Sequence, residues 1–98
     1  MLPSQILQKH RSKLLEIMKQ YPMISNLRVV GSVARGDDTP ESDIDFFVDA
    51  SPGTTLFDIG GLNENLEGLL GVSVNIITSG PHLGKSLRMS LERDAVCL

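Results

Sequence analysis

The sequence has few of the residues that build disulfide frameworks or base-stacking surfaces. Cys97 is its single cysteine, so an internal disulfide bond and a zinc site built from cysteines are both excluded. Tryptophan is absent, and only one tyrosine and three phenylalanines are present. Because single-stranded nucleic acids are held largely by bases stacked on aromatic rings, this composition argues against such binding.

Basic residues and long apolar runs are also scarce. Nine Lys and Arg stand against 12 Asp and Glu, for a net charge of −3, so we do not expect the basic face that binding to nucleic acid or anionic lipid requires. No run of about 18 apolar residues exists, which predicts no membrane-spanning helix. The polar residues 8–11 interrupt any apolar segment of a secretion signal. These features favour a cytoplasmic protein.

The 98 residues are enough for one small domain, and we expect a single domain over residues 1–98. Apolar periodicity predicts helices at 4–20, 55–70 and 84–92, and strands at 26–30, 43–49, 72–77 and 95–98. Between the first two strands we expect mostly loop, with one helical turn after Ser32. Gly60 and Gly61 interrupt the second long helix, and close packing against the sheet would account for them.

Two acidic residues stand two positions apart in a predicted strand. The carboxylates of Asp43 and Asp45 therefore leave the same face of that strand. Carboxylates this close repel each other unless a cation lies between them. Mg²⁺ accepts such a pair, because it takes oxygen ligands and leaves room for phosphates and water. A pair of this kind is also typical of a solvated strand face, and the pair alone does not decide between the two.

A second group of candidate residues follows the first predicted strand. Gly31 and Ser32 lie where that strand turns, and small residues there let the backbone approach a ligand closely. Free N–H groups and a serine hydroxyl at such a turn suit a phosphate group, although an ordinary turn has the same residues. Arg35 follows three positions after Ser32. Its guanidinium can bind a phosphate oxygen or hold the acidic residues of the next loop.

These positions together read Gly31-Ser32, ten intervening residues, and Asp43-Ile44-Asp45. The pattern resembles the nucleotidyltransferase superfamily related to DNA polymerase beta, and within it the minimal nucleotidyltransferase branch. The resemblance extends over nearly the whole chain, from the strand before Gly31 to the strand after the leucine-rich helix. It implies an α+β fold with a small mixed sheet of three or four strands flanked by helices.

The resemblance also implies an activity. Proteins of this kind transfer the nucleoside monophosphate of ATP, or of another nucleoside triphosphate, to a hydroxyl group and release pyrophosphate. In this chain Asp43 and Asp45 would be the catalytic residues and would hold Mg²⁺ or Mn²⁺. The residues implied to bind the nucleotide are Gly31, Ser32, Arg35 and Ser42.

A protein partner is a further implication of the resemblance. Minimal nucleotidyltransferases are often encoded beside a HEPN-type toxin and act as its antitoxin, and a tyrosine of the toxin would then be the acceptor. The chain is too short to add a separate acceptor-binding domain. We therefore expect the acceptor on another molecule, in a homodimer or a hetero-oligomer.

One position departs from the family pattern. The family places a third carboxylate in the strand after the leucine-rich helix, and Asn75 stands at the matching position here. Its amide oxygen can coordinate a cation weakly, but it carries no charge and cannot act as a base. Two interpretations follow: an enzyme of retained or reduced activity, or an impaired protein that acts by binding a partner or a nucleotide. Asp49 and Asp58 are not expected to substitute, because Asp49 lies too far along its strand and Asp58 is predicted to cap a helix.

Overall fold

The computed structural model describes residues 1–98 and shows an α+β fold built on one mixed sheet. The helices are α1 (Pro3–Lys9), α2 (Arg11–Met18), α3 (Gly31–Arg35), α4 (Leu56–Leu70) and α5 (Lys85–Asp94). The strands are β1 (Ile24–Val30), β2 (Ile44–Ala50), β3 (Val74–Thr78) and β4 (Val96–Cys97). The expected fold class is confirmed, and so is the helical turn after the first strand.

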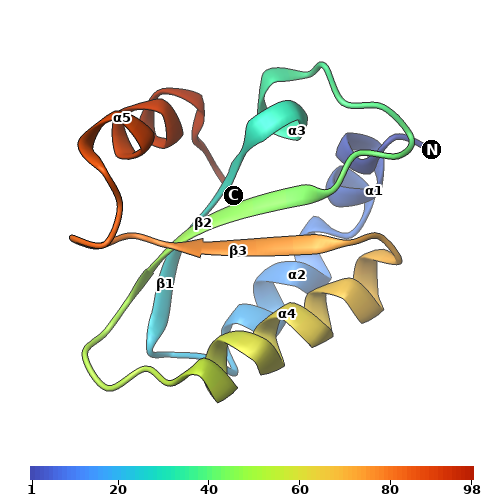
Figure 1. The fold of residues 1–98 in the computed structure, drawn as a ribbon. Helices are drawn as coiled ribbons and strands as arrows, with labels where there is room; N and C mark the ends of the chain where they lie inside the picture. The colour runs from blue at the N-terminus through green and yellow to red at the C-terminus, as the bar shows by residue number, and fades with distance from the viewer.

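The strand order in the sheet is β3-β2-β1-β4. β2 and β3 are parallel, whereas β1 is antiparallel to both of its neighbours. A parallel pair needs a long crossover connection, and α4 supplies it. Figure 1 shows α2 and α4 on one side of the sheet and α3 and α5 on the other.

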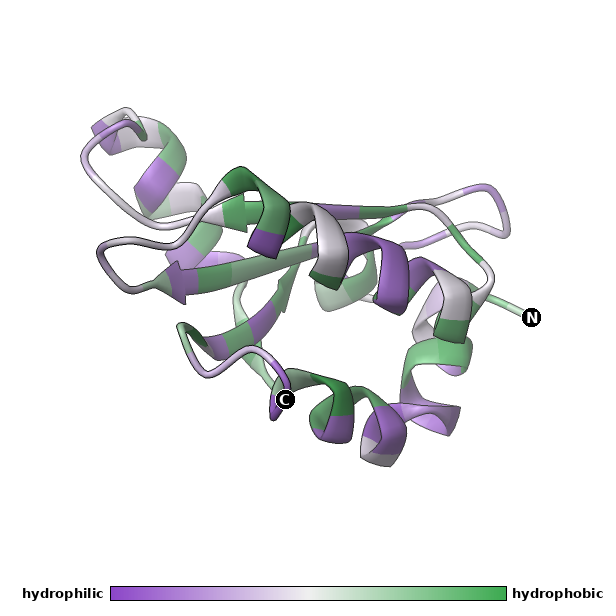
Figure 2. Ribbon diagram, turned by 90° about the horizontal axis from the view of Figure 1, so that it is seen from below, coloured by the Kyte–Doolittle hydropathy of each residue, from purple (hydrophilic) through white to green (hydrophobic).

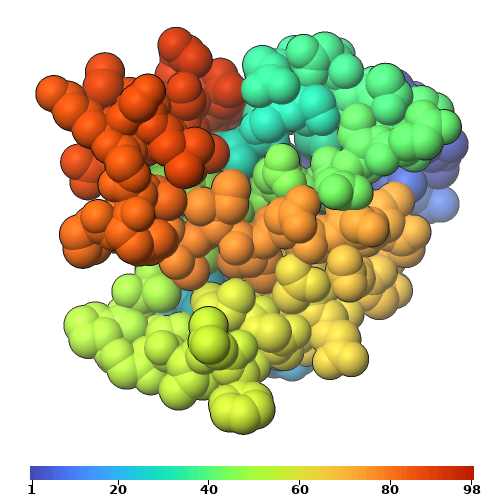
Figure 3. All heavy atoms as spheres, viewed as in Figure 1, coloured from blue at the N-terminus to red at the C-terminus, as the bar shows by residue number.

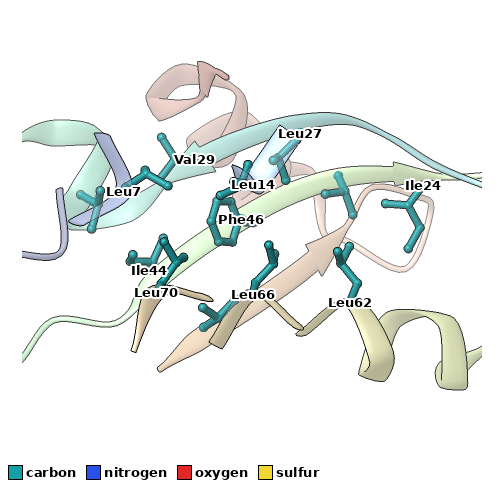
Figure 4. Packing of buried hydrophobic residues seen from close by; sticks show 13 residues of the cluster. Leu7, Leu14, Ile24, Leu27, Val29, Ile44, Phe46, Leu62, Leu66 and Leu70 are labelled. Atoms are coloured by element: carbon teal, nitrogen blue, oxygen red, sulfur yellow. The ribbon is translucent and has the colours of Figure 1, made fainter. Parts of the chain in front are cut away.

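The main hydrophobic core lies between the sheet and the helices α2 and α4. Alternate residues of β2, namely Ile44, Phe46 and Val48, point into this core and are fully buried, as the period of a strand requires. Figure 4 shows Phe46 near the middle of the cluster, with Leu14 of α2 and Leu66 of α4 among its members. This packing fixes which residues of β2 face the opposite side.

The opposite face of the sheet is covered over only part of its area. Phe47 of β2 is fully buried there in a small cluster with Val30 of β1 and Leu91 of α5. Asp43 is exposed and Asp45 is half-buried, so this face is open where the two carboxylates lie.

The helices carry both polar and apolar residues, and in Figure 2 hydrophilic and hydrophobic segments alternate along them. None of them has the length and apolar character needed to cross a bilayer.

The single helix predicted over residues 4–20 is wrong, because the chain forms two helices separated at His10. The backbone of His10 (φ −105°, ψ 13°) departs from helical geometry. α1 packs near α3, whereas α2 packs against α4. The two helices therefore need different directions, and the chain bends between them. The N–H of Ser4 also donates a hydrogen bond of 2.9 Å to Asp38, which ties α1 to the loop after α3.

The explanation expected for Gly60 and Gly61 is also wrong. A Cβ at Gly61 would lie 3.2 Å from the hydroxyl of Tyr21, so this glycine makes room for the segment after α2 and not for the sheet. Gly60 has open space around it. Strand limits differ by small margins, since β1 begins at Ile24 and the last strand spans only Val96–Cys97.

Candidate functional site

The strand register places Asp45 near the start of β2, an interior strand of the sheet. Asp45 pairs with Val30 of β1 on one side and with Asn75 of β3 on the other. Asp43 immediately precedes β2, two residues before Asp45, and its side chain is exposed. The strand pairing therefore brings Asp45 next to Val30, the last residue before the turn at Gly31, and the role of the two aspartates as a site stays a prediction.

Gly31 brings the backbone against one of these carboxylates. Its φ of +73° is a conformation that glycine adopts without strain. A Cβ built at this position would lie 2.8 Å from Oδ2 of Asp45, which is too close for any other residue without a shift. Gly31 therefore has two reasons to be glycine, and the second is direct contact with the acidic pair.

Asn75 links the two carboxylates from the β3 side. Its Nδ2 donates a hydrogen bond of 2.9 Å to Oδ1 of Asp45 and lies 3.4 Å from Oδ2 of Asp43. Ionised carboxylates only accept hydrogen bonds, so the amide must present its nitrogen to them. The predicted weak metal ligand is thus brought to the predicted site, where it acts as a donor.

The carboxylate oxygens of this site are suitable ligands for a divalent cation such as Mg²⁺. Asp43 and Asp45 offer carboxylate oxygens on an open face, and Mg²⁺ is usually held by one or two carboxylates together with phosphates and water. No side chain stands at Gly31, and a Cβ there would lie within 2.8 Å of Oδ2 of Asp45. No third His, Cys, Asp or Glu joins this pair.

The two serines predicted to bind nucleotide take different positions. Ser32 is half-buried and follows Gly31 at the start of α3, a helix that contacts β2. The hydroxyl of Ser42 accepts a hydrogen bond of 2.9 Å from the N–H of Thr39. Ser42 therefore closes the loop that leads into β2, and its contact with a nucleotide stays a prediction.

Arg35 is held by two acidic residues. Its guanidinium donates to Asp94 of α5 at 3.0 Å and to Asp37 at 3.4 Å, and these hydrogen bonds raise its pKa. About half of its side chain remains exposed. These contacts match the expected role of holding the acidic loop, and they also tie α3 to α5.

The structure contains a polar network that the sequence analysis did not identify. The Oδ1 of Asp49 accepts hydrogen bonds from Ser79 at 2.6 Å and from Arg28 at 2.8 Å, and its Oδ2 accepts one from Asn26 at 3.1 Å. The hydrogen bonds from Ser79 and Asn26, with the charge of Arg28, hold the pKa of Asp49 below its ordinary value. Arg28 also lies 4.1 Å above the ring of Phe47.

No sequence signal reveals this network, because its members come from β1, β2 and the residue that follows β3, which are far apart in the sequence. As expected, Asp49 does not join Asp43 and Asp45, and Asp58 caps α4 by pairing with Thr55.

The cavity found in the structure is lined by residues other than the acidic pair. It has a volume of about 290 Å³ and is lined by Glu67, Gly71, Val72 and Ser73, at the turn between α4 and β3. Figure 3 shows the atoms of α5 and those of α3 with its following loop on either side of the exposed strand residues. A ligand of the carboxylates would therefore rest on an open face of the sheet.

Comparison with known sequences relates this chain to one protein family. Residues 11–96 match the family described as nucleotidyltransferase domain. A proposed protein adenylyltransferase of Methanocaldococcus jannaschii, MJ1379, is 33% identical over 94 residues, which cover 94% of this chain and 90% of the relative. A second one from the same organism, MJ0126, is 30% identical over 92 residues, with 94% and 90% covered.

Comparison with solved structures also identifies a nucleotidyltransferase as similar to this chain. The structure of a proposed minimal nucleotidyltransferase is 37% identical, with a TM-score of 0.83 over 97% of this chain and 95% of that chain. A toxin–antitoxin structure with AMP-PNP has a TM-score of 0.72 at 19% identity and covers 88% of this chain and 69% of that chain. A mutant of the toxin–antitoxin MntA-HpeT also has a TM-score of 0.72, at 20% identity, over 90% and 70%. At these identities the last two show similarity of fold alone.

Proposed function

This chain belongs to the nucleotidyltransferase domain family, and from that premise we propose that it transfers AMP from ATP to a hydroxyl group of a protein partner in the cytoplasm. The proposal includes a dependence on Mg²⁺ or Mn²⁺. The observation that carries it is the acidic pair Asp43 and Asp45, held beside the Gly31 turn on an open sheet face.

The residues of this chain would act by position and charge. Asp43 and Asp45 would hold a divalent cation, which neutralises charge on the phosphates of the bound nucleotide. Gly31 lets the phosphates approach the backbone closely, and the hydroxyl of Ser32 can donate to a phosphate oxygen. The acceptor oxygen then bonds to the α-phosphorus, the bond to pyrophosphate breaks, and the acceptor proton passes to water. The protein forms no covalent bond and lowers the barrier by orienting the reactants.

Three observations support a protein as the acceptor. The matching Methanocaldococcus jannaschii relatives are named as protein adenylyltransferases. Toxin–antitoxin assemblies share the fold, and one of them was crystallised with AMP-PNP. The acidic pair lies on an open face and not in an enclosed pocket, which suits an acceptor presented by a second protein. We propose that this partner is a HEPN-type toxin and that the chain is its antitoxin.

Transfer of label from α-³²P-ATP to the partner, with Mg²⁺ present, tests the proposal. We expect the natural chain to label the partner and the double variant Asp43→Asn with Asp45→Asn to leave it unlabelled. Glu64→Gln, which removes one exposed charge on α4, is the matched control and should label the partner as the natural chain does. Labelling by the double variant, or none by the natural chain, would contradict the proposed activity.

Asn75 favours a second candidate, in which the chain neutralises its partner by binding alone. The amide that contacts both carboxylates carries no charge, so it supports nucleophile activation poorly. In that case the Asp43→Asn and Asp45→Asn double variant should still neutralise the toxin. Loss of neutralisation by the folded double variant would exclude binding alone.

A further inference from the structure

We infer that Asn75 makes this a site for a single divalent cation, which is bound together with the nucleotide and not before it. This inference deepens the proposed function and rests on it. It depends on which neighbour each of the two carboxylate oxygens of Asp45 faces.

The two oxygens of Asp45 face different partners. Oδ1 accepts the hydrogen bond from Nδ2 of Asn75 at 2.9 Å, on the β3 side. Oδ2 faces Gly31 on the β1 side, where a Cβ would lie only 2.8 Å away. The oxygen left free for a cation is therefore the one beside the predicted phosphate-binding turn, and the β3 side is already occupied by an amide donor.

The strand register keeps Asn75 in this place. β2 and β3 are parallel with Ile44 opposite Val74 and Asp45 opposite Asn75. Ile44 and Val74 are buried, and a slip of β3 by one residue would turn Val74 out of the core. The register consequently keeps the backbone of Asn75 beside that of Asp45, within hydrogen-bond reach of its carboxylate.

Charge favours one cation over two. The pair carries at most two negative charges, and no third His, Cys, Asp or Glu stands with it. One divalent cation balances the pair, so a second could be held only by the phosphates of the nucleotide and neutral ligands. Without a cation, the N–H groups of Asn75 offset part of the repulsion between the carboxylates. The free protein therefore has little drive to bind a cation before the nucleotide arrives.

Counting bound Mn²⁺ tests this inference with a readout independent of catalysis. Electron paramagnetic resonance would measure Mn²⁺ per chain with and without the non-hydrolysable analogue α,β-methylene-ATP. We expect one Mn²⁺ per chain for the natural protein with the analogue and two for Asn75→Asp. Asn75→Ala removes the amide without adding charge and should still bind one. Two Mn²⁺ per chain in the natural protein, or one in Asn75→Asp, would overturn the inference.

The measurement without nucleotide separates this inference from the proposed function. Asn75→Asp should bind Mn²⁺ at least about ten-fold more tightly than the natural chain, because it adds a third charged oxygen ligand. Equal binding by the two proteins would overturn the inference even if transfer were observed. Failure of the analogue to bind the natural chain would instead overturn the proposed function, while the nucleotide-free comparison still decides the role of Asn75.

Discussion

Replacing Gly31 by alanine tests the contact between the turn after β1 and the acidic pair. The new Cβ would meet two obstacles. It would sit at a φ of +73°, where side chains crowd the following carbonyl, and it would lie 2.8 Å from Oδ2 of Asp45. Gly36 provides a matched control, because its φ is +79° and a Cβ there would meet nothing within 4 Å.

The difference between the two variants isolates the contact with Asp45. An alanine in the left-handed region costs about 1–2 kcal/mol, and Gly36→Ala should lose about that much free energy of unfolding. Gly31→Ala has the same cost and must also displace the Asp45 carboxylate from its hydrogen bond with Asn75. A hydrogen bond on this open face is worth about 1 kcal/mol, so we expect Gly31→Ala to lose about 2–3 kcal/mol in total.

Urea unfolding followed by circular dichroism would give both free energies. For a chain of this size each 1 kcal/mol lowers the melting temperature by about 4–8 °C, so thermal unfolding would also separate the variants. Calorimetry with Mg²⁺ and ATP should show weaker binding by Gly31→Ala than by Gly36→Ala. Equal stability of the two variants, together with equal nucleotide binding, would refute the argument that Gly31 is required by its closeness to Asp45.

Three further predictions concern stability away from the turn. Phe46→Ala should cost about 3–5 kcal/mol in urea unfolding, because Phe46 is fully buried in the main core; a loss below about 1 kcal/mol would contradict that packing. Thr55→Ala should cost about 1 kcal/mol by removing the cap of α4, and unchanged urea unfolding would show that the cap contributes nothing. Asp49→Asn should be less stable than the natural chain at pH 7. Since the pKa of Asp49 is below its ordinary 3.8 in the folded state, its charged form stabilises the fold above pH 3.8, and the difference should close as pH falls further. If the two free energies of unfolding differ by the same amount at every pH from 7 to 2, the lowered pKa of Asp49 does not contribute to stability.

The sequence alone predicted those features that depend on residues close together in the chain. The alternation of β2 follows from residues 44–48, and the start of α4 follows from the Thr55–Asp58 capping pair. The end of α4 is marked by Gly71, whose φ of +71° is favourable for glycine. Each of these features depends on neighbours within a few positions, so a single sequence contains the full signal.

The site was predictable in its residue types but not in its contacts. Spacing alone brings Asp43 and Asp45 to one strand face. One of the two partners of Arg35, by contrast, is Asp94, which lies 59 positions later. The break at His10 arises because α1 packs near α3 whereas α2 packs against α4. Such pairs form only when distant elements pack together.

Apart from the break at His10, the sequence by itself determined the order of helices and strands, and it identified the acidic pair and the glycine turn. Only the tertiary structure decided what each oxygen of Asp45 faces, because Gly31 and Asn75 reach it from different strands through a register set by buried residues. Side-chain periodicity is a local property of the backbone, whereas strand register is fixed by which apolar residues fill the core.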